Sequence, residues 1–166
     1  MWRATMLVGA AMMALCGPAR AFDFHPRDFA VMFDEEAERQ GRPSRIHMLS
    51  CDPRAPYDCT YQGADSTLIE VFGSSWSGHS RTVAMLLSTG TSGDKTLFQD
   101  APFILAAIVS PKSSVDERKA LIGQIFPSSI AEGMAAPKFA MLGATKYTAG
   151  VLPHLILALG AIDTSE

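Results

Sequence analysis

Short turns separate the strand-like segments of this chain, and this spacing restricts the fold more than any other feature. Runs rich in β-branched, aromatic or alternating apolar residues are divided by glycine and proline positions. They predict strands over residues 45–51, 59–62, 67–72, 81–88, 138–142, 145–151 and 155–161. Parallel neighbours need a crossover of about a dozen residues or more. Segments joined by turns this short must therefore pair in antiparallel fashion.

A helix is predicted before the first strand. Apolar residues recur at steps of three and four over residues 26–40, and charged residues occupy the opposite face. Gly41 is a suitable residue to end this helix. Phe22 and Phe24, which precede it, are expected to pack on the same core.

A second helix is predicted over residues 101–109, with Asp100 as its N-cap and Pro102 in its first turn. Because it is apolar on nearly every side, we expect it to be buried.

A third helix begins with a capping box formed by Ser114 and Glu117. Its apolar stripe includes Arg118, whose aliphatic stem is expected to pack there while the charge stays outside. Pro127 is predicted to end the helix.

This order of elements predicts an α+β fold. The expected architecture is an antiparallel sheet of about five to seven strands, with an N-terminal helix and two central helices packed on one face. We expect residues 22–166 to form a single domain, since composition shows no linker and no repeat.

Residues 1–21 are expected to be a cleaved signal peptide. Arg3 precedes an apolar run over residues 4–16, and Ala19 and Ala21 match an A-x-A cleavage site. The run is shorter than the roughly 20 residues that cross a bilayer as a helix. The protein is therefore expected in the periplasm or outside the cell, without a transmembrane segment after cleavage.

Two alternatives to simple cleavage remain open: an uncleaved N-terminal anchor, and a lipoprotein signal that ends at Cys16. If Arg3 and Arg20 leave with the leader, the formal net charge of −3 becomes −5. An acidic domain of this kind is not attracted to nucleic acid.

Removal of the leader also leaves only two cysteines, Cys51 and Cys59, which predict one disulfide in an exported chain. The crosslink would close a short loop, a constraint that stabilises a fold by about 2.5 kcal/mol. Arg54 and Tyr57 lie in this proline-stiffened loop and are candidate binding residues, because a preorganised loop loses little entropy on binding. A second interpretation is that the disulfide only staples a hairpin.

No residues form a catalytic or metal-binding motif, and no glycine-rich phosphate loop indicates a cofactor. The segment GSSWSGHS, residues 73–80, is predicted to be a loop, because its spacing does not match a G-x-S-x-G nucleophile elbow. Trp76 at its tip is a candidate binding residue. Ser77 and His79 are the first residues to consider if the protein is a hydrolase assembled only in the fold.

Two patterns resemble small uncharacterised exported proteins of proteobacteria. The first is F-x-F-x-P-x-x-F-x-x-x-F over residues 22–33. The second is Val-Ser-Pro at 109–111, followed by Ser114 and an acidic-basic run at 116–118. The resemblance implies a periplasmic α+β domain and does not imply a function.

The sequence therefore predicts an exported, non-enzymatic binding module. Its expected partner is another periplasmic or secreted protein, or a small apolar ligand, and no cofactor is expected. The alternative is a periplasmic hydrolase.

Mass spectrometry of the exported protein tests the leader and the disulfide together. We expect a mass that starts at Phe22 and is lower by two hydrogens than that of the fully reduced chain. A mass that includes residues 1–21 would contradict cleavage.

Overall fold

The computed structural model describes residues 22–52, 54, 58–63, 67–73, 79–88, 96–132, 137–152 and 156–164. Its helices are α1 (Phe29–Arg39), α2 (Thr96–Val109) and α3 (Val115–Glu132), with a short 3-10 turn, η1 (Pro26–Asp28), before α1. Its strands are β1 (Ile46–Asp52), β2 (Asp58–Gly63), β3 (Leu68–Gly73), β4 (Ser80–Ser88), β5 (Lys138–Leu142), β6 (Thr145–Leu152) and β7 (Ile156–Asp163).

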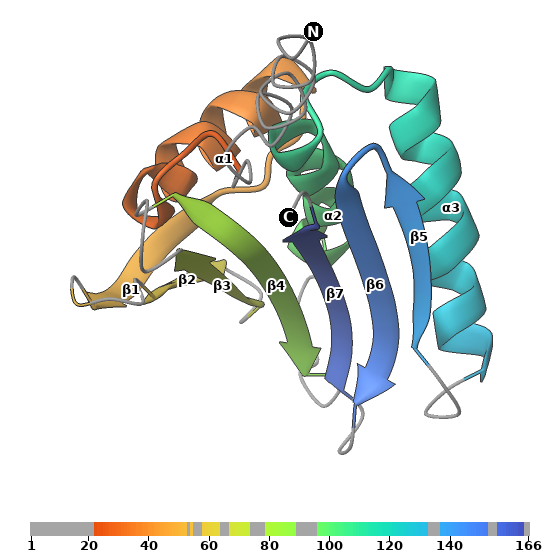
Figure 1. The fold of residues 1–166 in the computed structure, drawn as a ribbon. Helices are drawn as coiled ribbons and strands as arrows, with labels where there is room; N and C mark the ends of the chain where they lie inside the picture. The colour runs from red at the N-terminus through yellow and green to blue at the C-terminus, as the bar shows by residue number, and fades with distance from the viewer. Residues whose placement is uncertain are drawn as a thin grey trace, which may run out of the picture.

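The strands form one antiparallel sheet in the order β1-β2-β3-β4-β7-β6-β5, and the helices cover one of its faces (Figure 1). The predicted α+β class and the antiparallel pairing are confirmed, and each predicted strand boundary lies within two residues of the observed one. The spatial order of the strands was not predicted.

Pairing of β4 with β7 joins the two halves of the sheet. Their register runs from Thr82 opposite Ile162 to Ser88 opposite Ile156. After β4 the chain passes through α2 and α3 and enters β5 at the far edge of the sheet (Figure 1). Strands β6 and β7 then return inward until β7 lies beside β4.

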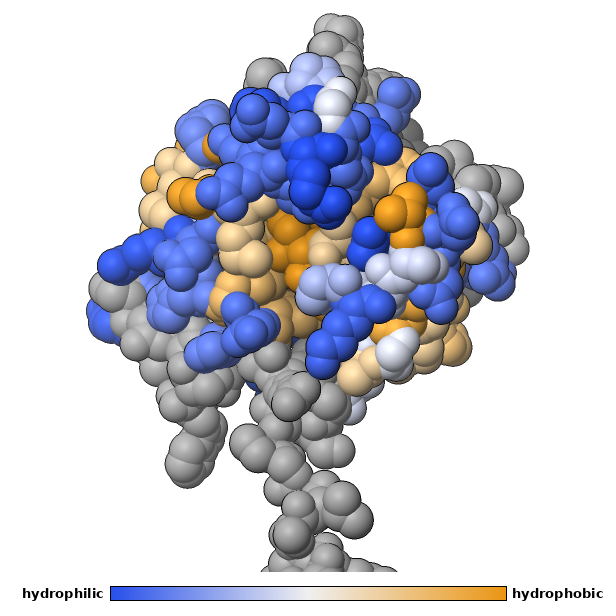
Figure 2. All heavy atoms as spheres, turned by 90° about the horizontal axis from the view of Figure 1, so that it is seen from above, coloured by the Kyte–Doolittle hydropathy of each residue, from blue (hydrophilic) through white to orange (hydrophobic). Residues whose placement is uncertain are grey.

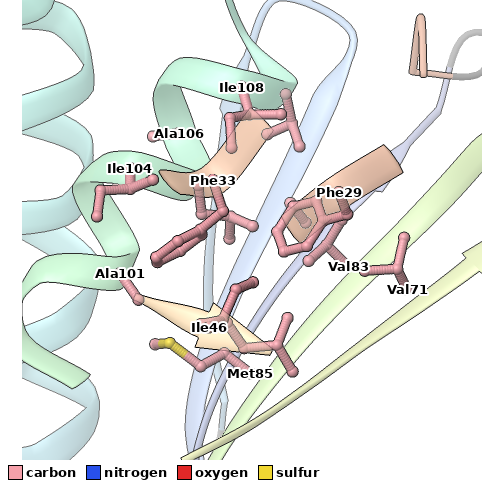
Figure 3. Packing of buried hydrophobic residues seen from close by; sticks show 14 of the residues in the cluster. Phe29, Phe33, Ile46, Val71, Val83, Met85, Ala101, Ile104, Ala106 and Ile108 are labelled. Carbon is pink, nitrogen blue, oxygen red and sulfur yellow. The ribbon is translucent and has the colours of Figure 1, made fainter. Parts of the chain in front are cut away.

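The core lies between the helices and the covered face of the sheet. Phe29 and Phe33 of α1 are fully buried, as the predicted apolar face requires. Phe29 lies toward Val83 of β4, and Phe33 lies toward Ile104 of α2 (Figure 3). Burial of these large side chains supplies the main driving force for packing the helices on the sheet.

The residues before α1 are part of the same core. Phe22 and Phe24 are buried, as predicted, with their rings stacked at a centroid distance of 5.9 Å. The Phe22 N–H donates to the Ser80 carbonyl at 2.7 Å, and the Ser80 N–H donates to the Phe24 carbonyl at 2.8 Å. The segment before α1 is thereby attached to the first residue of β4.

Glycines with positive φ end two of the predicted elements. Gly41 (φ +66°) follows α1, where its N–H donates to Glu38 and the Arg42 N–H donates to Ala37. These two bonds form a Schellman motif, which satisfies the last carbonyls of the helix. Gly143 (φ +62°) lies in the tight turn between β5 and β6.

The predicted N-cap at Asp100 is wrong. Helix α2 already begins at Thr96, so Asp100 and Pro102 lie inside it. The Asp100 carboxylate instead accepts hydrogen bonds from Arg42 and, at 2.8 Å, from the Ser44 hydroxyl. A tertiary contact with the segment after α1 therefore takes the place of a local cap.

The predicted end of the third helix at Pro127 is also wrong, because α3 continues to Glu132. A proline removes one helical hydrogen bond, but α3 packs along β5 and β6, and this tertiary packing supports the continued helix.

The predicted capping box at the start of α3 is confirmed. The Glu117 carboxylate accepts from the Ser114 N–H at 2.7 Å, and the Ser114 hydroxyl accepts from the Glu117 N–H at 3.2 Å. The Ser114 hydroxyl also donates to the carboxylate at 2.8 Å, and the bonds from the Ser114 N–H and hydroxyl lower the pKa of the Glu117 carboxyl below its ordinary value. They also fix the position at which α3 leaves the α2–α3 connection.

We expect Ser114→Ala to lower the free energy of unfolding by about 1 kcal/mol, because an orphan helix N–H loses its acceptor. Urea denaturation measures the change. Ser113→Ala is the matched control, since Ser113 forms its hydrogen bonds through its backbone N–H and carbonyl rather than its hydroxyl. Equal stability of the two variants would show that the cap has no role.

Candidate functional site

The cystine closes the first hairpin. Cys51 of β1 stands opposite Cys59 of β2 in the strand register, and the two form a disulfide with 4.0 Å between their Cα atoms. The predicted pairing is confirmed. Asp52 and Asp58 form the next strand pair toward the loop, so the crosslink sits one pair inside the base of the loop.

Arg54 is the candidate loop residue that the structure describes. Its side chain is 87% exposed, and its Nε and Nη2 atoms donate to the two Asp52 carboxylate oxygens at 3.0 and 2.9 Å. This contact lowers the pKa of Asp52 and raises that of Arg54. The Arg54 charge is therefore paired within the loop. This pairing disfavours the hypothesis that Arg54 binds a partner protein.

The other sequence candidates are not brought together within the described residues. Tyr57, Trp76 and Ser77 lie outside them. His79 is described, and it is an exposed residue directly before β4.

A larger candidate site lies at the end of the molecule where α2 stops and α3 starts. A hollow of about 680 Å³, here called the large hollow, opens between α1, the residues before it and the α2–α3 connection. Seen from this end, apolar residues form a central patch with hydrophilic residues around it (Figure 2).

The lining of the large hollow combines apolar and charged residues. Its apolar lining residues are Phe22, Phe24, Met32, Ala107, Ile108, Val109, Pro111 and Val115. The charged ones are Asp23, Glu35, Glu36, Arg39 and Arg118. Concave sites with an apolar lining and a few polar groups are typical of small-molecule binding.

A second hollow of about 240 Å³, here called the small hollow, adjoins the first. The two share Glu36, Arg39, Val115 and Arg118 as lining residues. The small hollow is further lined by Gln40, Arg42, Phe103 and Lys119. Together the hollows run between α1 and α3 across the outer side of α2.

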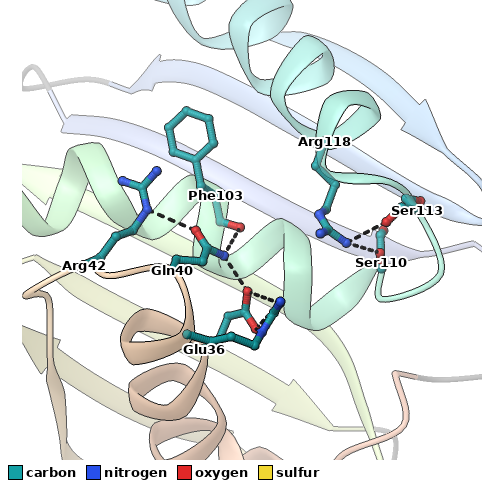
Figure 4. A network of polar contacts seen from close by, with 8 residues as sticks. Glu36, Gln40, Arg42, Phe103, Ser110, Ser113 and Arg118 are labelled. Atoms are coloured by element: carbon teal, nitrogen blue, oxygen red, sulfur yellow. Dashed lines mark hydrogen bonds and ion pairs between the residues drawn. The ribbon is translucent and has the colours of Figure 1, made fainter.

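Polar contacts hold the α1 side of the small hollow in place (Figure 4). The Glu36 carboxylate accepts from Arg39 Nε at 2.8 Å. The Gln40 side chain accepts from Arg42 Nε at 3.0 Å, and the Arg42 guanidinium stacks on the Phe103 ring at 4.8 Å. Arg42 also pairs with Asp100, so α1 and α2 are joined at this wall.

Arg118 is the buried charge at the junction of the two hollows. It is 9% exposed, and its Nη1 atom donates to the carbonyls of Ser113 and Ser110 at 2.7 and 3.3 Å (Figure 4). These carbonyls follow the C-terminus of α2, where the helix dipole favours a cation. Among the described residues, no carboxylate makes an ion pair with Arg118.

Ser110 connects this site to the sheet. Its hydroxyl hydrogen-bonds the Tyr147 hydroxyl of β6 at 2.7 Å. Burial raises the pKa of Tyr147 to about 12, and the Ser110 contact opposes part of that rise. The neutral phenol is therefore the form that the folded protein holds.

The hollows were missed by sequence reasoning because their lining comes from four separate segments. One signal was present: Arg118 falls in the apolar stripe of α3, and a charge in such a stripe is unusual. The prediction that only its stem is buried is wrong, since the guanidinium also lies inside the structure.

Comparison with protein-family models, curated proteins and solved structures found no match to this chain. Within the described ranges, no cluster of three potential metal ligands occurs. None of the helices that the structure describes combines the length and the apolar character needed to cross a membrane.

We expect the free energy of unfolding to fall between about pH 10 and pH 12, because Tyr147 holds its proton more tightly when folded. This contribution is complete below pH 10 and is lost as the pH rises through the folded pKa. Tyr147→Phe should flatten the decline, measured by urea denaturation across this range. An unchanged slope would contradict the assignment.

Proposed function

We propose that this chain is an exported, non-enzymatic binding protein that holds a small apolar ligand in the large hollow. The observation that carries the proposal is a concavity of about 680 Å³ whose lining contains eight apolar residues. This volume lies within the range of about 300–1,000 Å³ typical of small-molecule sites.

The walls of the large hollow support binding of a ligand without a large rearrangement. Gly41 ends α1 in a Schellman motif, and the Ser114–Glu117 capping box sets the start of α3. Rigid walls of this kind reduce the entropy lost when a ligand binds.

Export is the second part of the proposal. It rests on the leader at residues 1–21 and on the resemblance to small exported proteins of proteobacteria. The Cys51–Cys59 disulfide is in keeping with it, since disulfides persist in oxidising compartments such as the periplasm.

A small ligand is favoured over a protein partner by the shape of the site, because a partner protein requires a broad contact surface of about 800 Å². The cystine loop supports the protein alternative less well, since the charge of Arg54 is paired with Asp52. The lining residues do not favour a hydrolase. Among the described residues that line the two hollows, none is a histidine or a cysteine that could act as a base or a nucleophile.

The proposal is tested by titrating the purified protein with N-phenyl-1-naphthylamine, a neutral apolar dye that fluoresces when it leaves water. Val115 lines both hollows and is 52% exposed, so Val115→Gln changes the site without opening the core. We expect it to weaken dye binding by about five- to tenfold, since apolar contact is lost.

The matched control is Val31→Gln. Val31 is a 62% exposed valine on α1 that lines neither hollow, and its substitution should leave binding unchanged. No saturable dye binding, or equal loss in both variants, would overturn the proposal.

A further inference from the structure

The small hollow is the positively charged part of the site. Its lining contains four cations, Arg39, Arg42, Arg118 and Lys119, against one carboxylate, Glu36. Two of these cations have carboxylate partners, as described above. The other two, Arg118 and Lys119, make no ion pair with any described residue.

Arg118 has donors left over for a ligand. Both of its hydrogen bonds come from Nη1, so Nε and Nη2 donate to nothing among the described residues. Arg118 is only 9% exposed as a whole residue, and a guanidinium in such a position is costly to leave without a counter-charge. Its planar fork is suited to a carboxylate, which can accept two parallel hydrogen bonds.

Acidic residues define the opposite end of the site. Asp23 and Glu35 line the large hollow and do not line the small one. Their charges disfavour an anionic group beside them, so such a group is directed toward Arg118 and Lys119. The charges and the apolar lining of the large hollow together indicate a site for a molecule with an anionic end and a long apolar end.

We infer that the ligand of the hollows is a long-chain fatty acid. Its carboxylate lies against Arg118 and Lys119 in the small hollow. Its alkyl chain extends past Val115 along the apolar lining residues of the large hollow. This inference rests on the proposed function and adds to it the class of the ligand and its orientation.

The first experiment compares ligands of equal chain length. Tetradecanoate and tetradecanol are used to displace N-phenyl-1-naphthylamine from the purified protein at neutral pH. Since a charge-assisted hydrogen bond is stronger than a neutral one, we expect the acid to bind at least about tenfold more tightly than the alcohol. Tetradecylamine, which carries a positive charge, should bind more weakly than either.

The second experiment changes the cations. Lys119 is exposed, so Lys119→Gln should fold normally and weaken tetradecanoate binding by about two- to fivefold, with tetradecanol unaffected. Lys112→Gln is the matched control, because Lys112 is an exposed lysine that lines neither hollow. Arg118→Gln should remove the preference for the acid, provided that its thermal unfolding shows a folded protein.

The outcomes separate the two proposals. Tighter binding of the acid that depends on Lys119 supports both. Equal binding of acid and alcohol, with loss in Val115→Gln, overturns the fatty-acid inference and leaves an apolar-ligand protein. Binding of none of the three compounds overturns the proposed function itself. If Arg118→Gln does not fold, an acid preference unchanged in Lys119→Gln overturns the inference.

Discussion

The antiparallel pairing of β4 with β7 is the interaction on which the rest of the structure depends. It joins a four-strand half built before the central helices to a three-strand half built after them. In this fold the chain enters the second half at the far edge of the sheet, and α2 and α3 on the covered face connect β4 to that edge. This path places the α2–α3 connection beside α1, and the hollows exist because these segments meet.

Much of the fold could be predicted because its signals are local. Turn spacing, the apolar face of α1 and the Ser114–Glu117 box each depend on neighbouring residues, and all agree with the structure. The predictions at Asp100 and Pro127 are wrong because contacts with distant segments decide both. The Asp100 carboxylate accepts hydrogen bonds from Arg42 and Ser44, and α3 continues past Pro127 where it packs on the sheet. Strand order depends on pairing between distant segments, which no local pattern encodes.

The site was less predictable than the fold. The cysteine pair could be predicted, since removal of the predicted leader would leave two cysteines and therefore one pairing. The hollows could not, because Phe24, Met32, Val109 and Arg118 come close only after three helices have packed. The charge of Arg118 inside the apolar stripe of α3 was the one local feature of the sequence that indicated a role for this helix face besides packing.

The way Phe22 is held has a consequence for the accessibility of the segment before α1. Phe22 is 6% exposed, and its N–H is bonded to the carbonyl of Ser80 at the start of β4. A protease needs an accessible, extended segment on both sides of the bond that it cuts. In the folded protein the backbone at Phe22 does not offer such a segment, so a protease can act there only after this segment has separated from β4.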